Sequence, residues 1–432
     1  MKFTRERAFD IAWRVAVLAL PWQTRWIFST PAVSGFPWEQ GTAAAYASWI
    51  FLVIAIIFGF ELKKGVRIAF PQWTMSAGVL AVLMLVVVSF FTAAPIATTI
   101  WWAHIILLAL FGWVLWKRNI SRTDFATWAV ISILPHALIG IWQSFMQEAP
   151  GSTLLGMAAH EPWKSGTSVV EYGEYRILRA YGGFPHPNIL GGWLAIGLAL
   201  LPDLARRATA RMNYLWIACA AVFSAALVLT FSRGAWIAAF VGLVIAVGVA
   251  LRETRIMDQR QAVWGVGVIV TIVSSFFLIY HWDAFVTRLG AYERLERWSV
   301  DQRTASLSDG IHAWQQRPLA GWGPGASVIG IAHVRPSVVV ASEPPHLAPL
   351  TALVETGIAG ILSLLLFGFL FFRDLFRRGE LVRMLPLLAV AALIAGTDHY
   401  LWTLWAGQAL LMLLILMGLR EDEPKIGKNA LS

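Results

Sequence analysis

Runs of about 20 mostly apolar residues recur along the chain, and they constrain its fold more than any other feature. A helix of about 20 residues crosses the hydrocarbon core of a bilayer. Charged residues make up only 14% of the 432 residues, whereas soluble domains contain roughly 25%. We therefore predict an all-α integral membrane protein with about twelve transmembrane helices, at 8–30, 43–60, 73–91, 97–116, 125–146, 188–205, 213–231, 235–251, 262–281, 347–372, 384–398 and 400–419.

Two long stretches without apolar runs interrupt this series and are expected to be loops on one side of the membrane. They divide the chain into six predicted segments. These are 1–146 with the first five helices, the loop 147–187, 188–281 with helices six to nine, the loop 282–346, 347–419 with the last three helices, and a tail at 420–432.

Basic residues mark the opposite side of the membrane. If the twelve helices alternate in direction, clusters such as Arg206-Arg207, Arg252-Arg255 and Arg377-Arg378 all fall on one side. Cytoplasmic loops are enriched in Lys and Arg, so both termini are predicted to be cytoplasmic and both long loops exoplasmic. Arg14 interrupts the first apolar run, which we interpret as a retained helix and not a cleaved signal peptide.

Charge and cysteine content exclude several functions. The formal net charge is +9, but the excess lies in the predicted cytoplasmic loops, because loop 282–346 holds six arginines and six acidic residues. This distribution argues against nucleic-acid binding. A single cysteine argues against a disulfide scaffold, a cysteine-ligated metal and a redox dithiol pair.

Four polar groups lie at the predicted exoplasmic face, and the first is the short turn at 230–236. Arg233 stands there between two apolar runs, followed by Gly234. An arginine at a membrane boundary commonly faces a polar cavity or a partner. The alternative is an arginine that extends toward lipid headgroups.

The second group, residues 179–188, enters the sixth predicted helix. It contains Arg179, a glycine pair, His186 and Asn188. His186 and Asn188 could present hydrogen-bond donors to a substrate from the start of that helix. In the alternative interpretation Asn188 only caps the helix.

The third group ends the long loop at 303–325. It starts with Arg303 and finishes with glycines at 321, 323 and 325. No predicted strand precedes these glycines and no Lys-Ser/Thr pair follows them, so a nucleotide-binding loop is not indicated. We expect a tight, exposed turn.

The fourth group places His346 directly after two prolines and before a predicted helix that contains Glu355, Gly357 and Gly360. The prolines restrict the approach of the chain, so His346 is held in place and could accept a proton near neutral pH. A purely structural histidine is the alternative. Glu355 falls about half a helical turn away from His346 and is not expected to pair with it.

Arginine dominates the predicted exoplasmic side. Of ten basic residues there, only Lys164 is a lysine. The planar guanidinium matches phosphate oxygens, whereas a lysine acts as a point charge. This preference suits a pyrophosphate substrate.

In their order and membrane side, these groups resemble the O-antigen ligase and polymerase superfamily of membrane glycosyltransferases. The resemblance is close over roughly 180–372 and rests elsewhere on topology. The ligases' motif is His, then Asn, Ser or Gln, then nine residues, then Gly-x-x-Gly/Thr/Tyr. His346, Gly357 and Gly360 match it, and Leu347 departs from it.

The resemblance implies a GT-C-like helical fold in a bacterial cytoplasmic membrane, with the active site facing the periplasm or exterior. It implies inverting, metal-independent transfer of a glycan from a polyprenyl-pyrophosphate donor to an acceptor hydroxyl, with neither metal nor other cofactor. His346 would be the catalytic base. Arg233 and Arg303 would bind the donor pyrophosphate with Arg179 or Arg288 as additional ligands, and His186 and Asn188 would bind substrate.

The acceptor class is left open by the resemblance. Ligation to a lipid, polymerisation of a glycan and transfer to protein hydroxyls could all use the same residues, in contact with membrane lipids and without nucleic acid. A secondary transporter is the rival class, since twelve helices also suit that architecture. Transporters place ionisable residues near the middle of the bilayer, whereas the polar groups here gather at one membrane face.

Overall fold

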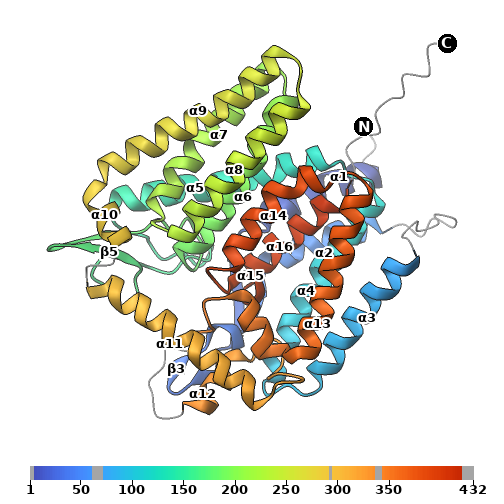
Figure 1. Ribbon diagram of the computed structural model, residues 1–432, viewed down its shortest axis with the longest axis vertical. Coiled ribbons are helices and arrows are strands. Elements are labelled where there is room, and N and C mark those ends of the chain that lie inside the picture. Colours follow the sequence, from blue (N-terminus) through green and yellow to red (C-terminus); the bar gives the residue numbers. More distant parts are fainter. Residues whose placement is uncertain (1–3, 61–71, 291–293, 336–342, 421–432) are drawn as a thin grey trace.

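The computed structural model describes residues 4–60, 72–290, 294–335 and 343–420. The basic residues Lys63, Lys64 and Arg67, which lie between the second and third predicted spans and belong to the predicted cytoplasmic side, are outside these ranges, as is the tail beyond Arg420. Helices dominate the described part (Figure 1). They are α1 (Arg5–Ala19), α2 (Ala47–Gly59), α3 (Gln72–Ser89), α4 (Pro95–Lys117), α5 (Arg122–Met146), α6 (Pro187–Arg207), α7 (Ala210–Leu229), α8 (Arg233–Glu253), α9 (Met257–Tyr280), α10 (Trp282–Gly290), α11 (Arg294–Gln316), α12 (Ser327–Val334), α13 (Ala348–Arg377), α14 (Leu381–Ala395), α15 (Tyr400–Thr403) and α16 (Trp405–Gly418).

Strands are few and short. The antiparallel pairs are β1 (Arg25–Ser29) with β4 (Ala43–Tyr46), β2 (Ala32–Val33) with β3 (Phe36–Pro37), and β5 (Val169–Tyr172) with β6 (Tyr175–Leu178). A 3₁₀ turn, η1 (Glu39–Gly41), precedes β4. The described chain is thus a helical protein with small hairpins between helices.

Seven described helices are long and apolar enough to cross a membrane: α4, α5, α6, α7, α8, α9 and α13. Helices α2, α14, α16 and part of α3 are shorter apolar helices. A multi-pass membrane protein is therefore supported, while the count of twelve stays a prediction.

The predicted first span, 8–30, is wrong beyond its first half. Helix α1 ends at Ala19, close to Pro21, because proline has no N–H to continue the helical hydrogen bonds. The chain then forms β1, whose residue Arg25 is ion-paired with Glu39 and lies opposite Tyr46 on β4. Cross-strand pairing therefore replaces the last turns of the expected helix.

Helix α6 is the central helix of the bundle. Nearly all of it is buried, and it packs against α5, α7, α8, α9 and α14. Gly191 lets α8 approach closely, because a Cβ there would lie 2.6 Å from the Cβ of Ala235. The first turns of α6 and α8 consequently lie side by side.

The predicted long loops are partly folded. Loop 147–187 contains the β5–β6 hairpin, and loop 282–346 contains α10, α11 and α12. Figure 1 shows α10, α11, α12, β3 and β5 gathered toward one end of the helical bundle. The two loops therefore share one end of the molecule, as the alternation of helices requires.

Residues 321–325 of the glycine-rich turn are buried, so the expectation of an exposed turn is wrong for them, whereas Leu319 is 71% exposed. Helix α13 is interrupted at Gly357, which has φ 62° and ψ −169°. In this interruption the Ile358 amide donates to the Pro318 carbonyl at 2.9 Å, and the Trp322 amide donates to the Val354 carbonyl at 3.0 Å. The turn thus satisfies main-chain groups that the broken helix cannot pair internally.

Candidate active site

A cavity of about 150 Å³ brings together four of the predicted site residues and several others. Three of its cationic groups come from separate elements, α8, α10 and α11. It is lined by Asn188, Ser232, Arg233, Gly234, Ala235, Ile237, Arg288, Arg303, Ile394, Thr397, Asp398 and Tyr400. A pocket with three arginines is suited to an anion carrying several negative charges.

Arg233 is the first residue of α8, and the chain turns sharply before it. Phe231 adopts a positive φ of 48°, and its fully buried ring packs with Val170 and Ala284. The first turn of a helix has amides without partners inside the helix and the positive end of the helix dipole, and the side chain of Ser232 makes no capping hydrogen bond here. Arg233 therefore adds its charge at a helix end that already favours anions.

Arg288 and Arg303 enter the cavity from the folded loop. Arg288 is buried and donates from Nε to the Phe231 carbonyl at 2.9 Å, while its own carbonyl accepts from Arg233 at 2.8 Å. Arg288 therefore also fixes the turn that presents Arg233. The half-buried Arg303 guanidinium makes no hydrogen bond or ion pair with another described side chain or carbonyl.

Arg179 stands behind the cavity and not in its wall. This buried side chain donates to the Thr230 carbonyl and to Oδ1 of Asn188, both at 2.7 Å. The side-chain amide of Asn188 in turn donates to Oδ2 of Asp398 at 2.8 Å. The placement makes Arg179 a support for Asn188 and Asp398, and direct pyrophosphate binding by Arg179 stays a prediction.

His186 is the N-cap of α6. Its Nδ1 accepts from the backbone amide of Asn188 at 3.1 Å, and its Nε2 contacts the Ser168 hydroxyl at 3.0 Å. Burial and the nearby Arg179 charge lower the pKa of His186 to about 3. His186, and not Asn188, therefore caps the helix as a neutral ring, and substrate binding by His186 stays a prediction.

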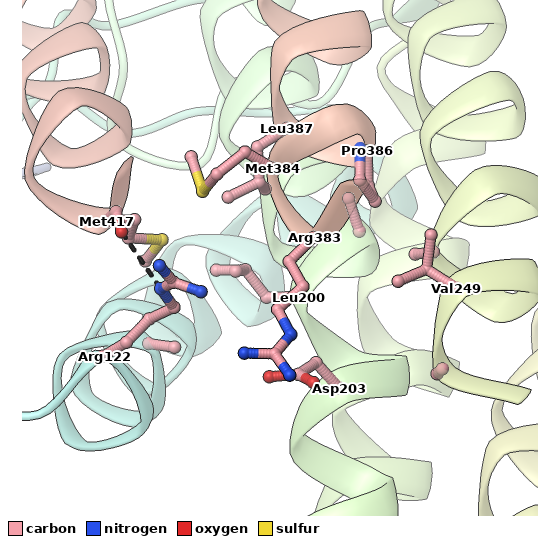
Figure 2. Close-up of a pocket in the computed structure, with 13 residues that line it drawn as sticks. Arg122, Leu200, Asp203, Val249, Arg383, Met384, Pro386, Leu387 and Met417 are labelled. Carbon is pink, nitrogen blue, oxygen red and sulfur yellow. Dashed lines mark hydrogen bonds between the residues drawn. The ribbon is translucent and has the colours of Figure 1, made fainter. Parts of the chain in front are cut away.

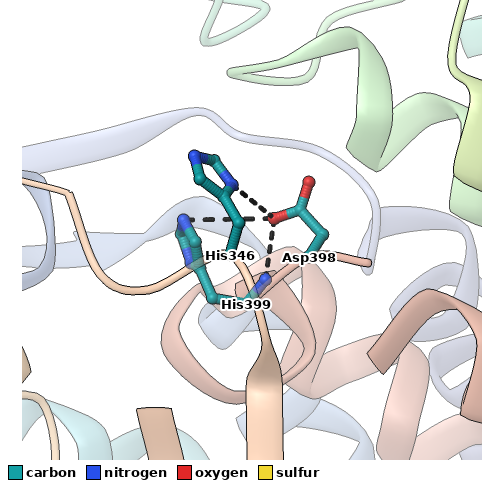
Figure 3. Close-up of side chains that lie close together, drawn as sticks. All are labelled: His346, Asp398 and His399. Atoms are coloured by element: carbon teal, nitrogen blue, oxygen red, sulfur yellow. Dashed lines mark hydrogen bonds and ion pairs between the residues drawn. The ribbon is translucent and has the colours of Figure 1, made fainter. Parts of the chain in front are cut away.

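His346 lies beside a carboxylate that the sequence analysis did not identify. Its Nδ1 is 3.9 Å from Oδ1 of Asp398, and its Nε2 is 3.5 Å from Oε2 of Glu343. Figure 3 shows the rings of His346 and His399 next to each other, both within ion-pair distance of the Asp398 carboxylate. The amide of His399 also donates to Asp398 at 2.8 Å, so Asp398 is anchored both by its own loop and by α6.

These contacts set the protonation states of the cluster. Burial disfavours the charged form of His346, but the carboxylates of Asp398 and Glu343 outweigh burial and raise the pKa of His346 to about 9. Burial alone would raise the pKa of Asp398, but contact with His346 and the charge of His399 lower it well below its usual range. Asp398 is therefore a carboxylate at neutral pH, and His346 is an imidazolium when the site is empty.

Asp398 was missed because hydropathy assigned it to a helix. The predicted spans 384–398 and 400–419 leave only His399 between them, whereas α14 ends at Ala395 and α15 begins at Tyr400. The polar sequence Asp398-His399 between two apolar runs was the available signal.

Among the described residues, His346, Asp398 and His399 form a group that could hold a metal ion, since one ligand atom of each lies within 4.8 Å of the others. The His–Asp contacts are 3.9 and 4.0 Å, whereas ligands about 2.0–2.1 Å from a tetrahedral zinc lie roughly 3.3 Å apart. The side chains would have to move inward, and Asp398 already accepts hydrogen bonds on both oxygens. An ion-pair cluster fits this geometry better than a metal site.

A second cavity lies where α5, α6, α8, α14 and α16 meet (Figure 2). It measures only about 40 Å³, which is room for one or two waters. Arg122 at its edge donates to the Met417 carbonyl at 3.0 Å and pairs with Glu380 at 2.7 Å. These paired charges hold helix ends together and leave no space for a substrate.

Comparison with known families finds a match that includes the three arginines of the cavity. Residues 217–365 match the family described as O-antigen ligase. This match supports membership of the O-antigen ligase family. The matched O-antigen ligase region contains Arg233, Arg288, Arg303 and His346, whereas Asn188 and Asp398 lie outside it. No curated protein matches the chain.

Proposed function

We propose that this chain is a glycosyltransferase that moves a glycan from a polyprenyl-pyrophosphate donor to an acceptor hydroxyl at the exoplasmic face. The observation that carries this proposal is the convergence of Arg233, Arg288 and Arg303 on one cavity whose wall includes Asp398, the partner of His346. This arrangement pairs an anion-binding wall with a group that accepts protons.

The arginines act on the leaving group. As the bond between the sugar's anomeric carbon and the pyrophosphate oxygen breaks, that oxygen takes the electron pair and negative charge develops on the pyrophosphate. Arg233 and Arg303, together with the first turn of α8, stabilise this charge in place. No metal is needed for that task, and the enzyme is proposed to work without one.

His346 acts on the acceptor. In its neutral form, Nδ1 carries the proton toward Asp398, and Nε2 takes the proton of the acceptor hydroxyl while the acceptor oxygen bonds to the anomeric carbon. Attack opposite the departing pyrophosphate inverts the configuration. Nε2 faces Glu343, whose side chain is 60% exposed, so an acceptor can displace Glu343 from this position. The imidazolium then returns its proton to solvent.

The acceptor is proposed to be a lipid-linked sugar, as in ligation. Polymerisation of glycan repeats and transfer to protein hydroxyls are the alternatives, since each presents a hydroxyl to the same base. A transporter is less well supported, because the cavity lies at the first turns of α6 and α8 and not near the middle of those helices.

Reconstituted transfer tests the proposal. Purified full-length protein receives polyprenyl-pyrophosphate-linked glycan and candidate acceptors, with and without a chelator. His346→Ala should bind donor but lose transfer about 10²–10⁴-fold, the usual contribution of a general base, and Arg303→Ala should bind donor poorly. His312→Ala, an exposed histidine on α11, should transfer normally.

Two outcomes would contradict the mechanism. Full turnover by well-folded His346→Ala would remove the base assignment. Loss of wild-type turnover in chelator, restored by a divalent cation, would show that a metal is required and direct attention to His346, Asp398 and His399.

A further inference from the structure

The phenol of Tyr400 lies in the same cavity and has no role in the mechanism above. Tyr400 is 2% exposed and lines the cavity together with Arg233 and Asp398. A buried tyrosine hydroxyl normally finds a hydrogen-bond partner. Among the described residues, the hydroxyl of Tyr400 makes no hydrogen bond, so a partner of suitable chemistry is expected from a ligand in the cavity.

Two glycines pack closely against Tyr400, one at its side chain and one at its main chain. A Cβ on Gly192 of α6 would lie 1.9 Å from the Tyr400 phenol oxygen, and a Cβ on Gly407 of α16 would lie 1.9 Å from the Tyr400 carbonyl oxygen. Any larger residue at either position would displace Tyr400. The phenol oxygen is thus fitted closely against Gly192, and Gly407 packs against the main chain of the same tyrosine; we call these two contacts the glycine seat.

The position of the hydroxyl along α6 indicates what it meets. Gly192 lies four residues after Asn188, which is about one helical turn, so the hydroxyl sits one turn further from the helix start than the Asn188 amide. Ile394 lies beside this position, since its Cδ1 would be 3.3 Å from a Cβ on Gly192, and Ala235 and Ile237 also line the cavity. Ile237 is 55% exposed on the outer surface of α8, so this side of the cavity adjoins the apolar exterior of the bundle.

A ligand that contacts both the arginines and these apolar residues would be anionic at one end and apolar at the other. We propose that the Tyr400 hydroxyl donates a hydrogen bond to the phosphate that carries the lipid chain of the donor, while the arginines bind the phosphate that carries the glycan. This assignment rests on the proposed function and adds a specific donor contact to it. Tyrosine keeps its proton near neutral pH, so the phenol is a donor to an anionic oxygen.

Binding of undecaprenyl diphosphate to the full-length protein tests the contact. A hydrogen bond to a charged group is stronger than one between neutral groups, so Tyr400→Phe should weaken binding by about tenfold or more without lowering the melting temperature. Tyr214→Phe is the matched control, because Tyr214 is 76% exposed at the start of α7. Arg233→Ala serves as the reference for the cavity.

The Arg233→Ala variant separates the hypothesis of a Tyr400 contact from the proposed function on which it rests. If Arg233→Ala weakens binding and Tyr400→Phe does not, the Tyr400 contact is wrong and the proposed function stands. If neither variant changes binding, the diphosphate does not occupy this cavity and the proposed function fails. A lower melting temperature for Tyr400→Phe with unchanged binding would assign the hydroxyl a structural role and also overturn the proposal.

A double-variant cycle tests the glycine seat independently. Gly192→Ala should weaken binding strongly in the wild-type background, because the new Cβ collides with the phenol oxygen. In the Tyr400→Phe background the nearest tyrosine atom that remains is the ring carbon Cζ, at 3.1 Å, so the additional effect of Gly192→Ala should be small. Additive losses would show that Gly192 acts through some other contact and would contradict the seat.

Discussion

The Nδ1 atom of His346 lies 3.9 Å from the Oδ1 atom of Asp398, and this pair connects the start of α13 to the loop that follows α14. Asp398 is in turn held by Asn188 on α6 at 2.8 Å, and Asn188 is held by Arg179 at 2.7 Å. The charge and orientation of His346 are therefore set by residues that never need to touch the acceptor. In our mechanism Asp398 is a positioning residue, because it acts through the imidazole.

The pH dependence of transfer should report this relationship. A base must be neutral, and the carboxylates raise the pKa of His346 to about 9, so kcat/KM should rise with pH and level off above about pH 9. Asp398→Asn removes a negative charge that favours the imidazolium, and the rising limb should move to lower pH by about one pH unit or more. The measurement is kcat/KM from pH 5 to 10, which follows ionisations of the free enzyme.

Glu343→Gln is the comparison for that experiment. Glu343 also favours the imidazolium, but its side chain is 60% exposed, so solvent screens it and the limb should move less than in Asp398→Asn. If the rising limb of the kcat/KM profile lies at the same pH in Asp398→Asn as in the wild type, a group other than His346 controls the pH profile.

Arg233→Lys should lose transfer although it preserves charge. A single ammonium cannot reproduce the fork that binds two phosphate oxygens and, at the same time, reaches the Arg288 carbonyl. We expect roughly a 10- to 100-fold fall in transfer and a larger fall in Arg233→Ala. Steady-state kinetics with the same donor measure both, with Arg294→Lys as a control, since that side chain is 79% exposed on α11. Normal turnover and abundance of Arg233→Lys would instead favour an arginine that only anchors to lipid headgroups.

Much of the helical pattern and several residues of the candidate cavity could be predicted, because both leave local signals, while the roles of these residues stay predictions. Apolar runs mark helices directly, and an arginine or histidine at the edge of such a run marks a membrane boundary. Asn188, Arg233, Arg288 and Arg303 were all predicted site residues, and all line one cavity.

What could not be predicted depends on contacts between distant segments. Asp398 resembles the end of a helix until its link to Asn188 is seen. Leu347 departs from the family motif at a polar position, and here it is the uncapped start of α13, while Asp398 approaches the imidazole from another loop. The composition of the turn at 318–325 suggests an exposed turn, yet its main chain forms hydrogen bonds with the backbone of α13 on both sides of the break at Gly357.

Glu355 should prove important for stability. Its carboxylate accepts hydrogen bonds from the Gly325 amide at 2.7 Å, from the Ser327 amide and hydroxyl at 3.2 and 2.7 Å, and from the Trp402 indole at 2.6 Å. Glu355→Gln replaces one acceptor oxygen by a donor and leaves buried donors unpaired, at a cost of about 2–4 kcal/mol. Thermal unfolding in detergent should show a lower midpoint, and Glu161→Gln, at an exposed position, should not. An unchanged midpoint for Glu355→Gln would mean that the turn is held by its main-chain bonds alone.

Membrane sidedness is open to a direct test, because the proposed chemistry requires the cavity to face outward. The long loops meet at one end of the bundle, and basic clusters such as Arg206-Arg207 and Arg377-Arg378 end α6 and α13. Positive clusters stay in the cytoplasm, so a reporter active only outside the cytoplasm should work when fused near residue 165 or 310 and fail near 255 or 378.

Cysteine labelling tests the same membrane sidedness in the full-length protein. Cys219 is the single cysteine and is buried in α7, so the parent should react little with a membrane-impermeant maleimide. Ser165→Cys and His312→Cys should be labelled in intact cells, whereas Arg255→Cys should be labelled only after the membrane is opened. Labelling of Arg255→Cys in intact cells, together with protection of His312→Cys, would place the arginine-lined cavity on the cytoplasmic side, where an exoplasmic acceptor could not reach His346.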